Sequence, residues 1–200
     1  MLTQQTLDHL WDFEHPDISE ARFRSAMSED RYDADERAEL KTQLGRAIGL
    51  QGRFEEADAV LDTIDGEEPA VAVRVLLERG RVLNSSGHSE MAVPLLEQAA
   101  ELADHLGEEF LAVDALHMLA VAYTAHAETW TRSALEYAST VRDERTKRWL
   151  VVLHIDLGRT LHDAGRCTEA RVEFQLAEQW AGRVGTPRQQ ELARAAMDAC

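Results

Sequence analysis

Three arginines share one position in a recurring pattern, and their chemistry suits ligand binding. Arg46, Arg81 and Arg159 each directly follow a glycine that begins the same series of small and large residues. A guanidinium group presents planar donors that pair with both oxygens of a carboxylate, so these residues predict a site for a carboxylate-bearing ligand. The alternative is that the arginines form ion pairs with acidic side chains of neighbouring repeats. The sequence leaves both interpretations open.

Other residue types with chemical potential do not occur in the arrangements that enzymes need. His154 and His162 lie eight residues apart on one expected helix, too far for the one-turn spacing of a HExxH zinc motif. His117 and His162 could approach each other from adjacent helices, but the pattern of a metal site is lacking. Phosphate-binding and dinucleotide-binding glycine motifs are also absent from the sequence. We therefore expect no enzymatic activity, no metal and no cofactor.

The glycines before the three arginines belong to a spacing that occurs three times. Each copy has a glycine, a second glycine seven residues later, an alanine five further on, a large apolar residue four further on and an apolar residue three after that. The copies are Gly45-Gly52-Ala57-Leu61-Ile64, Gly80-Gly87-Ala92-Leu96-Ala99 and Gly158-Gly165-Ala170-Phe174-Ala177. Self-similarity of this kind is typical of a helical repeat array.

Each position of the pattern has a physical role in a pair of antiparallel helices. A glycine inside a helix costs about 1 kcal/mol relative to alanine, so the first glycine needs a close helix contact as its reason. The second glycine suits a left-handed helix C-terminus. We expect Ala57, Ala92 and Ala170 to be buried against the preceding helix's glycine. The large residues Leu61, Leu96 and Phe174 should fill the layer between the helices.

The pattern resembles the tetratricopeptide repeat family. Leu44-Gly45-x2-Ile48 and Leu157-Gly158-x2-Leu161 match the first half of the family pattern with aliphatic replacements, and Ala170-x3-Phe174 matches the second half. The family tryptophan is absent. The resemblance covers residues 35–184, with a weaker copy, third along the chain, that has Ala120 in place of the first glycine. The spacings from Gly45 to Gly80, from Gly80 to Ala120 and from Ala120 to Gly158 are 35, 40 and 38 residues, and they exceed the family's usual length of about 34. These longer repeats look like those of bacterial tetratricopeptide proteins.

The resemblance implies an all-α fold, a right-handed α-α superhelix of about four helix-turn-helix repeats with capping helices at both ends. An insertion of two residues is expected around 127–129, and Thr186-Pro187-x-Gln189 predicts a capping box that opens the last helix, with Leu192 and Ala196 facing inward. The expected divisions are a degenerate capping helix pair at 1–33, repeats at 34–66, 68–107, 108–142 and 143–185 within 34–186, and a capping helix at 187–200.

The family's ligands lie against the first helix of each repeat, which lines the concave face. Carried over one position at a time, the resemblance implies a ligand-binding surface that consists of Thr42, Arg46, Arg74, Leu77, Arg81, Asn84, His117, Val121, Thr124, Ile155, Arg159 and His162. The family's known dicarboxylate clamp uses lysine and asparagine here. Thr42 and Arg46 do not match it, so binding of a chaperone tail is not expected.

Composition narrows the class of partner. The 200 residues carry a formal net charge of −16, which argues against nucleic acid or an anionic membrane as the main ligand because both need a basic surface. Cys167 and Cys200 are the only cysteines and form no disulfide framework, as expected in a reducing cytoplasm. No secretory signal and no apolar run of about 20 residues is present. We expect a cytoplasmic location.

These observations favour a non-enzymatic protein-protein interaction module, a scaffold-type protein that binds a peptide or partner segment in a concave groove. One alternative is a sensor or regulatory domain that binds a small ligand or signal peptide in the same groove. The other is a scaffold that associates with itself. The identity of the partner, the pathway and the oligomeric state do not follow from the sequence.

Overall fold

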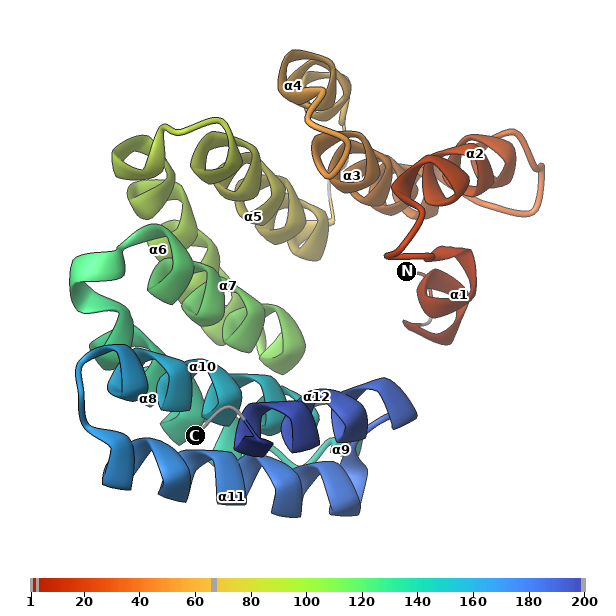
Figure 1. Cartoon of the computed structure of the whole chain (residues 1–200). Coiled ribbons are helices and arrows are strands. Elements are labelled where there is room, and N and C mark those ends of the chain that lie inside the picture. The colour runs from red at the N-terminus through yellow and green to blue at the C-terminus, as the bar shows by residue number, and fades with distance from the viewer. Residues whose placement is uncertain (1, 3, 66–67, 199–200) are drawn as a thin grey trace. The chain divides into compact units, whose positions relative to one another are not determined.

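The structure is a computed structural model that describes residues 2, 4–65 and 68–198, and these residues form helices and turns without a β-strand (Figure 1). The predicted all-α class is confirmed. The chain divides into two compact units, residues 1–108 and 109–200, which are described separately. Gly66 at the predicted end of the first repeat and Cys200 lie outside the described residues.

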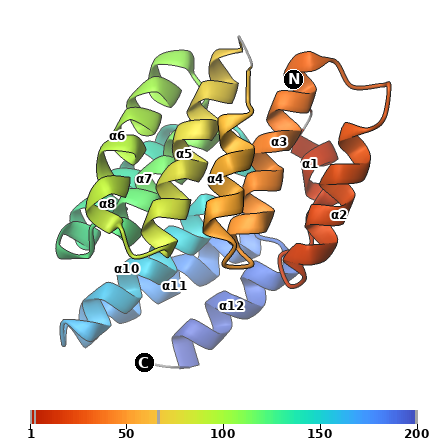
Figure 2. The same cartoon turned by 90° about the horizontal axis from the view of Figure 1, so that it is seen from above.

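The first unit contains six helices among its described residues. They are α1 (Gln4–Leu10), α2 (Pro16–Met27), α3 (Ala34–Gly49), α4 (Phe54–Asp62), α5 (Pro69–Ser85) and α6 (Ser89–Leu106). Helix α3 packs against α2, α4 and α5, and α5 packs against α6 (Figure 2). Phe23, Leu40, Leu44 and Ile48 are fully or almost fully buried and form the core of this layer.

The second unit contains six α-helices and one 3-10 turn among its described residues. They are α7 (Glu109–Ala122), η1 (Thr124–His126), α8 (Ala127–Thr140), α9 (Glu144–Lys147), α10 (Trp149–Asp163), α11 (Cys167–Val184) and α12 (Pro187–Asp198). Helix α7 pairs with α8 and α10 pairs with α11, while α8 also packs against α10. Helix α12 lies on α11 and α10.

The turns of three helix pairs are the ones that the glycine pattern predicts. Gly52, Gly87 and Gly165 have φ angles of +76°, +86° and +74°, in the left-handed region that glycine adopts at little cost. Behind Gly87, the N–H of His88 donates to the Leu83 carbonyl at 2.8 Å, which satisfies a carbonyl at the end of α5. His88 occupies the N-cap of α6, and Ser89 is the first residue of that helix.

The glycines inside α3, α5 and α10 are positions of close helix contact, and at Gly45 the Ala57 carbonyl oxygen is one of the nearest atoms, as the prediction requires. Ala57, Ala92 and Ala170 are fully buried, as expected. A methyl group built on Gly45 would first meet Leu61 Cδ2 at 2.9 Å, and the equivalent neighbours of Gly80 and Gly158 are Leu96 and Phe174. The large residue one turn beyond each alanine therefore covers the glycine, because its longer side chain reaches across the layer.

The third helix pair departs from the others at its turn. Its two additional residues were expected around 127–129, but those residues already belong to α8. The extra length is taken up just before them by η1, where the Tyr123 carbonyl accepts the N–H of His126 at 2.8 Å. No glycine occurs between Tyr123 and His126, so this turn is built without a left-handed residue.

The first helix of the fourth pair is divided by Arg148 into α9 and α10. The preceding loop is capped by Asp143, whose carboxylate accepts hydrogen bonds of 2.7 Å from both the hydroxyl and the backbone N–H of Thr146. These two bonds hold the pKa of the Asp143 carboxyl below its ordinary value, and the bond from the Thr146 hydroxyl has the larger effect.

Both ends of the chain differ in detail from the expected capping helices. The helix pair expected at 1–33 starts with the short helix α1, which ends at Leu10 because Asp12 Oδ1 accepts the backbone N–H groups of Glu14 and His15 and forms a turn. Pro16 begins α2, since its fixed φ suits the first helical turn.

Helix α12 begins with the predicted capping box. The N–H of Thr186 donates to Gln189 Oε1 at 3.0 Å, and the N–H of Gln189 donates to Thr186 Oγ1 at 3.3 Å. Ala196 is buried as expected, but Leu192 is 42% exposed and Ala193 is the fully buried residue. The inward face of α12 is thus rotated by one residue from the prediction.

No single helix among the described residues combines the length and apolarity needed to span a membrane; the bent pair Glu109–Ala122 and Thr124–Thr140 passes that test only when its two parts are taken together.

Candidate ligand-binding surfaces

In the first unit, the arginines expected to bind a ligand are engaged with buried carboxylates. Arg74 Nη2 lies 2.8 Å from Oε1 of Glu39, a carboxylate with no exposed surface. Arg81 Nε and Arg46 Nη1 lie 3.2 Å and 3.9 Å from the two oxygens of Glu78, which is also buried. A buried carboxylate needs such partners because an unpaired charge away from water is costly. The ion-pair interpretation therefore describes this unit well.

The remaining predicted residues of the first unit are two buried side chains and the partly buried Asn84. Thr42 and Leu77 are buried, and the Thr42 hydroxyl donates to the Glu39 carbonyl at 2.7 Å. Asn84 Oδ1 accepts the hydroxyl hydrogen of Ser89 at 2.8 Å, which ties the end of α5 to the start of α6. The pattern predicts that these residues lie on the first helix of each pair, but the burial of Thr42 and Leu77 depends on how the next helix packs.

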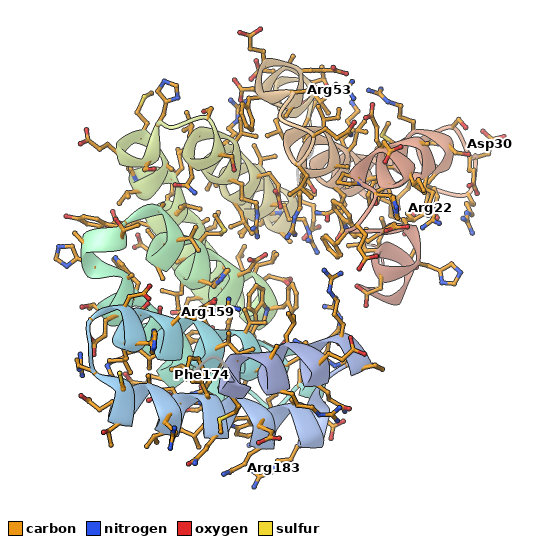
Figure 3. All side chains as sticks on the ribbon, in the orientation of Figure 1. Arg22, Asp30, Arg53, Arg159, Phe174 and Arg183 are labelled. Atoms are coloured by element: carbon orange, nitrogen blue, oxygen red, sulfur yellow. The ribbon has the colours of Figure 1, made fainter. Side chains whose placement is uncertain are left out.

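In the second unit, three of the predicted residues line one hollow of about 330 Å³ between α7, α8 and α10. These residues are His117 and Val121 on α7 and Arg159 on α10. The rest of the lining is Ala120, Ala127, Thr131, Asp156, Thr160 and Asp163. Figure 3 shows Arg159 on the side of α10 away from Phe174, so the hollow opens opposite the α10–α11 core.

Asp156 organises the polar groups of this hollow. Its Oδ2 lies 3.1 Å from His117 Nε2, and its Oδ1 lies 3.6 Å from Arg159 Nη1. The Arg159 side chain remains 60% exposed, in contrast to the short, buried contact between Arg74 and Glu39. An incoming carboxylate could therefore pair with the Arg159 guanidinium without first breaking a buried ion pair.

Three predicted residues of the second unit lie away from this hollow. Thr124 belongs to η1 and lines a separate surface depression of about 560 Å³ with Glu128 and Arg132. Ile155 is buried in the core with Phe174. His162 is partly exposed, with its Nδ1 3.7 Å from Asp163 Oδ1.

The most important residue missed by the sequence prediction is Asp156. A signal for it existed: Asp156 lies two residues before Gly158, just as Glu78 lies two residues before Gly80, and both carboxylates contact the arginine that follows the glycine. The described residues contain no group of three or more His, Cys, Asp or Glu side chains placed to hold a metal ion. The arrangement in the hollow offers hydrogen-bond donors and acceptors for binding.

Comparison with protein-family models and with curated proteins found no match. Among solved structures, the chain is similar to BtubC (BKLC) from P. vanneervenii, with a TM-score of 0.59 and 17% sequence identity. The match covers 92% of this chain and 75% of that chain. At this level of identity the similarity concerns the fold alone.

Proposed function

We propose that the chain is a non-enzymatic protein-binding module built from tetratricopeptide-like repeats, and that the hollow between α7, α8 and α10 binds a carboxylate-bearing peptide segment. The single observation that carries this proposal is the exposed Arg159 guanidinium, which shares a hollow with two other residues that the repeat pattern predicted, His117 and Val121. A right-handed superhelix of four repeats and a cytoplasmic location belong to the same proposal.

The chemistry of the hollow suits a peptide. Arg159 can pair with an Asp or Glu side chain or a C-terminal carboxylate, and Val121 offers an exposed apolar contact. The carboxylates of Asp156 and Asp163 can accept N–H groups of the peptide backbone. Residues 109–200 carry 13 acidic and 11 basic residues, a formal charge of −2, so an acidic ligand meets little general repulsion there.

Selection from a peptide library tests this proposal. Peptides displayed on phage would be selected on the wild-type chain, and the enriched peptides measured by isothermal titration calorimetry. We expect enrichment of Asp and Glu, and an affinity that falls about tenfold or more with Arg159→Gln, since hydrogen bonds to a charged group contribute about 1.5–3 kcal/mol. Added NaCl should also weaken binding. Arg142→Gln, at an exposed arginine outside the hollow, is the control.

The result that contradicts the proposal is equally specific. Arg159→Gln should leave stability within about 0.5 kcal/mol of wild type, because the side chain is largely exposed. If this folded variant binds the selected peptides as well as wild type does, or if the selected peptides lack carboxylates, the hollow is not the binding site.

A small carboxylate ligand is the second candidate, because the volume of about 330 Å³ is within the range of small-molecule sites. This is the sensor function considered above. Native mass spectrometry of the chain purified from its host would detect a co-purified small acid that Arg159→Gln no longer retains. A peptide ligand that extends beyond the hollow would not appear as a co-purified small acid in this measurement.

A further inference from the structure

The N-terminal segment, residue 2 together with residues 4–13, contacts one stripe of α3 through Leu2, Trp11 and Phe13. This stripe includes Arg46, a position that the repeat pattern assigns to a ligand. The backbone N–H of Leu2 donates to Glu39 Oε2 at 2.9 Å, and the indole N–H of Trp11 donates to Gln43 Oε1 at 3.0 Å. Glu39, Gln43 and Arg46 are spaced four and three residues apart, so they lie on one face of α3.

Aromatic contacts complete the interaction. The rings of Trp11 and Phe13 are stacked, with centroids 4.5 Å apart and planes 3° from parallel. The Arg46 guanidinium lies 5.5 Å from the centroid of each ring, within the range of a cation–π interaction. The edge of Trp11 also meets Phe23 of α2. These are contacts of the kind that a bound peptide makes with a helix face.

The described residues of α1 are less buried than those of α3, the helix beside which the segment lies. Helix α1 has seven residues, too few for a stable helix without tertiary contacts. Among the residues of α1 whose side chains are described, Leu7 is the one that is buried. In α3, by contrast, buried residues occur along most of the helix. Segments with few buried contacts open locally at low cost in free energy.

A hydrogen-bonded turn between Asp12 and Ser19 joins the segment to α2. The N–H of Asp12 donates to Ser19 Oγ at 2.7 Å, and the Ser19 hydroxyl donates to the Asp12 carbonyl at 2.9 Å. Ser19 is fully buried. Helix α1 also packs against α2. Displacement of the chain up to Phe13 therefore requires the two hydrogen bonds between Asp12 and Ser19 to break, at the start of α2.

We propose that the N-terminal segment, residue 2 together with residues 4–13, is a built-in occupant of the α3 face, and that a protein partner engages this face by displacing the segment with a short amphipathic helix of the same chemistry. Such a partner segment carries two leucines three residues apart, like Leu7 and Leu10. It ends in two aromatic residues that take the places of Trp11 and Phe13. The inference rests on the proposed function in one respect, that helix faces of this fold bind peptides. It assigns a second surface, in the first unit, and a kind of partner.

The segment itself provides the probe. A fluorescein-labelled synthetic peptide of residues 2–15 would be titrated with the full chain, and binding followed by fluorescence polarisation. In wild type the face is occupied, so the apparent affinity is reduced by the small fraction of open molecules. The double variant Leu7→Asp, Trp11→Ala opens the face, and we expect it to bind the peptide at least about tenfold more tightly than wild type does.

Two matched controls show that the peptide occupies the intended surface. A peptide with Trp11→Ala should bind the opened variant at least about fivefold more weakly, since it lacks one hydrogen bond and one aromatic contact. Adding Gln43→Leu to the opened variant removes the acceptor of the indole and should weaken binding of the unmodified peptide. Arg159 takes no part in this assay, so its outcome and that of the test above can be told apart.

Hydrogen exchange of the unmodified wild-type chain provides a second measurement if the double variant does not fold. We expect amides in α1 to exchange at least about 100-fold faster than those in the middle of α3. The inference is overturned if the folded, opened variant does not bind the peptide, if binding is indifferent to Trp11 of the peptide, or if α1 and α3 exchange at the same rate.

Discussion

Glycines inside α3, α5 and α10 let each of these helices approach its partner, α4, α6 or α11, closely, because glycine has no side chain. At Gly158 an added Cβ would overlap the Phe174 ring, while at Gly182 in α11 it would meet nothing within 4 Å. Both glycines lie in helix interiors, so both substitutions to alanine gain about 0.5–1 kcal/mol of helix propensity. The two substitutions therefore differ in whether the added methyl group has room, and not in helix propensity.

Gly158→Ala should therefore destabilise the protein, whereas Gly182→Ala should stabilise it slightly. Overpacking a dense core costs about 1–3 kcal/mol, which outweighs the gain in propensity at Gly158. Urea unfolding followed by circular dichroism would measure the difference. An equal or higher stability of Gly158→Ala would mean that α10 and α11 are farther apart than the structure shows.

Asp143 predicts a pH-dependent contribution to stability. Its pKa is lower in the folded protein than the ordinary 3.8 because Thr146 donates to the carboxylate. A lowered pKa stabilises the fold above the unfolded-state pKa, and this contribution is lost as the pH falls through the folded-state pKa. Asp143→Ala should cost about 1 kcal/mol at pH 7, as is usual for an N-cap. The difference from wild type should shrink below about pH 4, and urea unfolding at pH 7, 5 and 3 would show whether it does.

The candidate site was only partly predictable from single residues. The pattern placed His117, Val121 and Arg159 on the first helices of their pairs, and they do line one hollow. It could not show that Thr42 and Ile155 are buried, because burial depends on side chains of helices that are distant in the sequence. Nor could it show whether an arginine meets a buried carboxylate, as Arg74 does, or stays exposed, as Arg159 does.

At the scale of helices, prediction succeeded where a residue with special backbone geometry marks an end. Gly52, Gly87 and Gly165 gave the turns, and Pro187 with Gln189 gave the start of α12. The turn of the third pair contains no such residue, and its boundaries were misplaced. The end of α1 is likewise marked by neither glycine nor proline, because a short-range turn at Asp12 follows it.

The orientation of α12 can be tested by two adjacent residues. Ala193 is fully buried in the core that includes Phe174 and Ala177, while Leu192 is largely exposed. Ala193→Asp would place an unpaired carboxylate in this core and should cost several kcal/mol, about 3 or more. Leu192→Asp should change stability by no more than about 0.5 kcal/mol.

Thermal unfolding and light scattering of the two variants provide the measurement. Ala193→Asp should detach α12, lower the melting temperature and promote association through the exposed apolar face of α10 and α11. Equal effects of the two substitutions would mean that α12 does not cap this core with the face described here.

At the scale of the whole molecule, charge is distributed very unequally between the two units. Residues 1–108 carry 24 acidic and 10 basic residues, a formal charge of −14, against −2 for residues 109–200. Ion pairs such as Arg53 with Glu20 and Arg79 with Asp58 offset part of this excess locally. A large net charge destabilises a compact state through self-repulsion, so the first unit should be the one limited by electrostatics.

This asymmetry predicts how the separated units respond to salt. Each has its own buried core, so fragments 1–108 and 109–200 should each fold and melt cooperatively. Raising NaCl from 20 to 300 mM shortens the Debye length from about 20 Å to below 8 Å and screens repulsion between surface carboxylates. The melting temperature of fragment 1–108, followed by circular dichroism, should rise by several degrees, while that of fragment 109–200 should change little. Equal shifts in both fragments would show that net charge does not limit the first unit, and a fragment that fails to fold alone would show that its core needs the other unit.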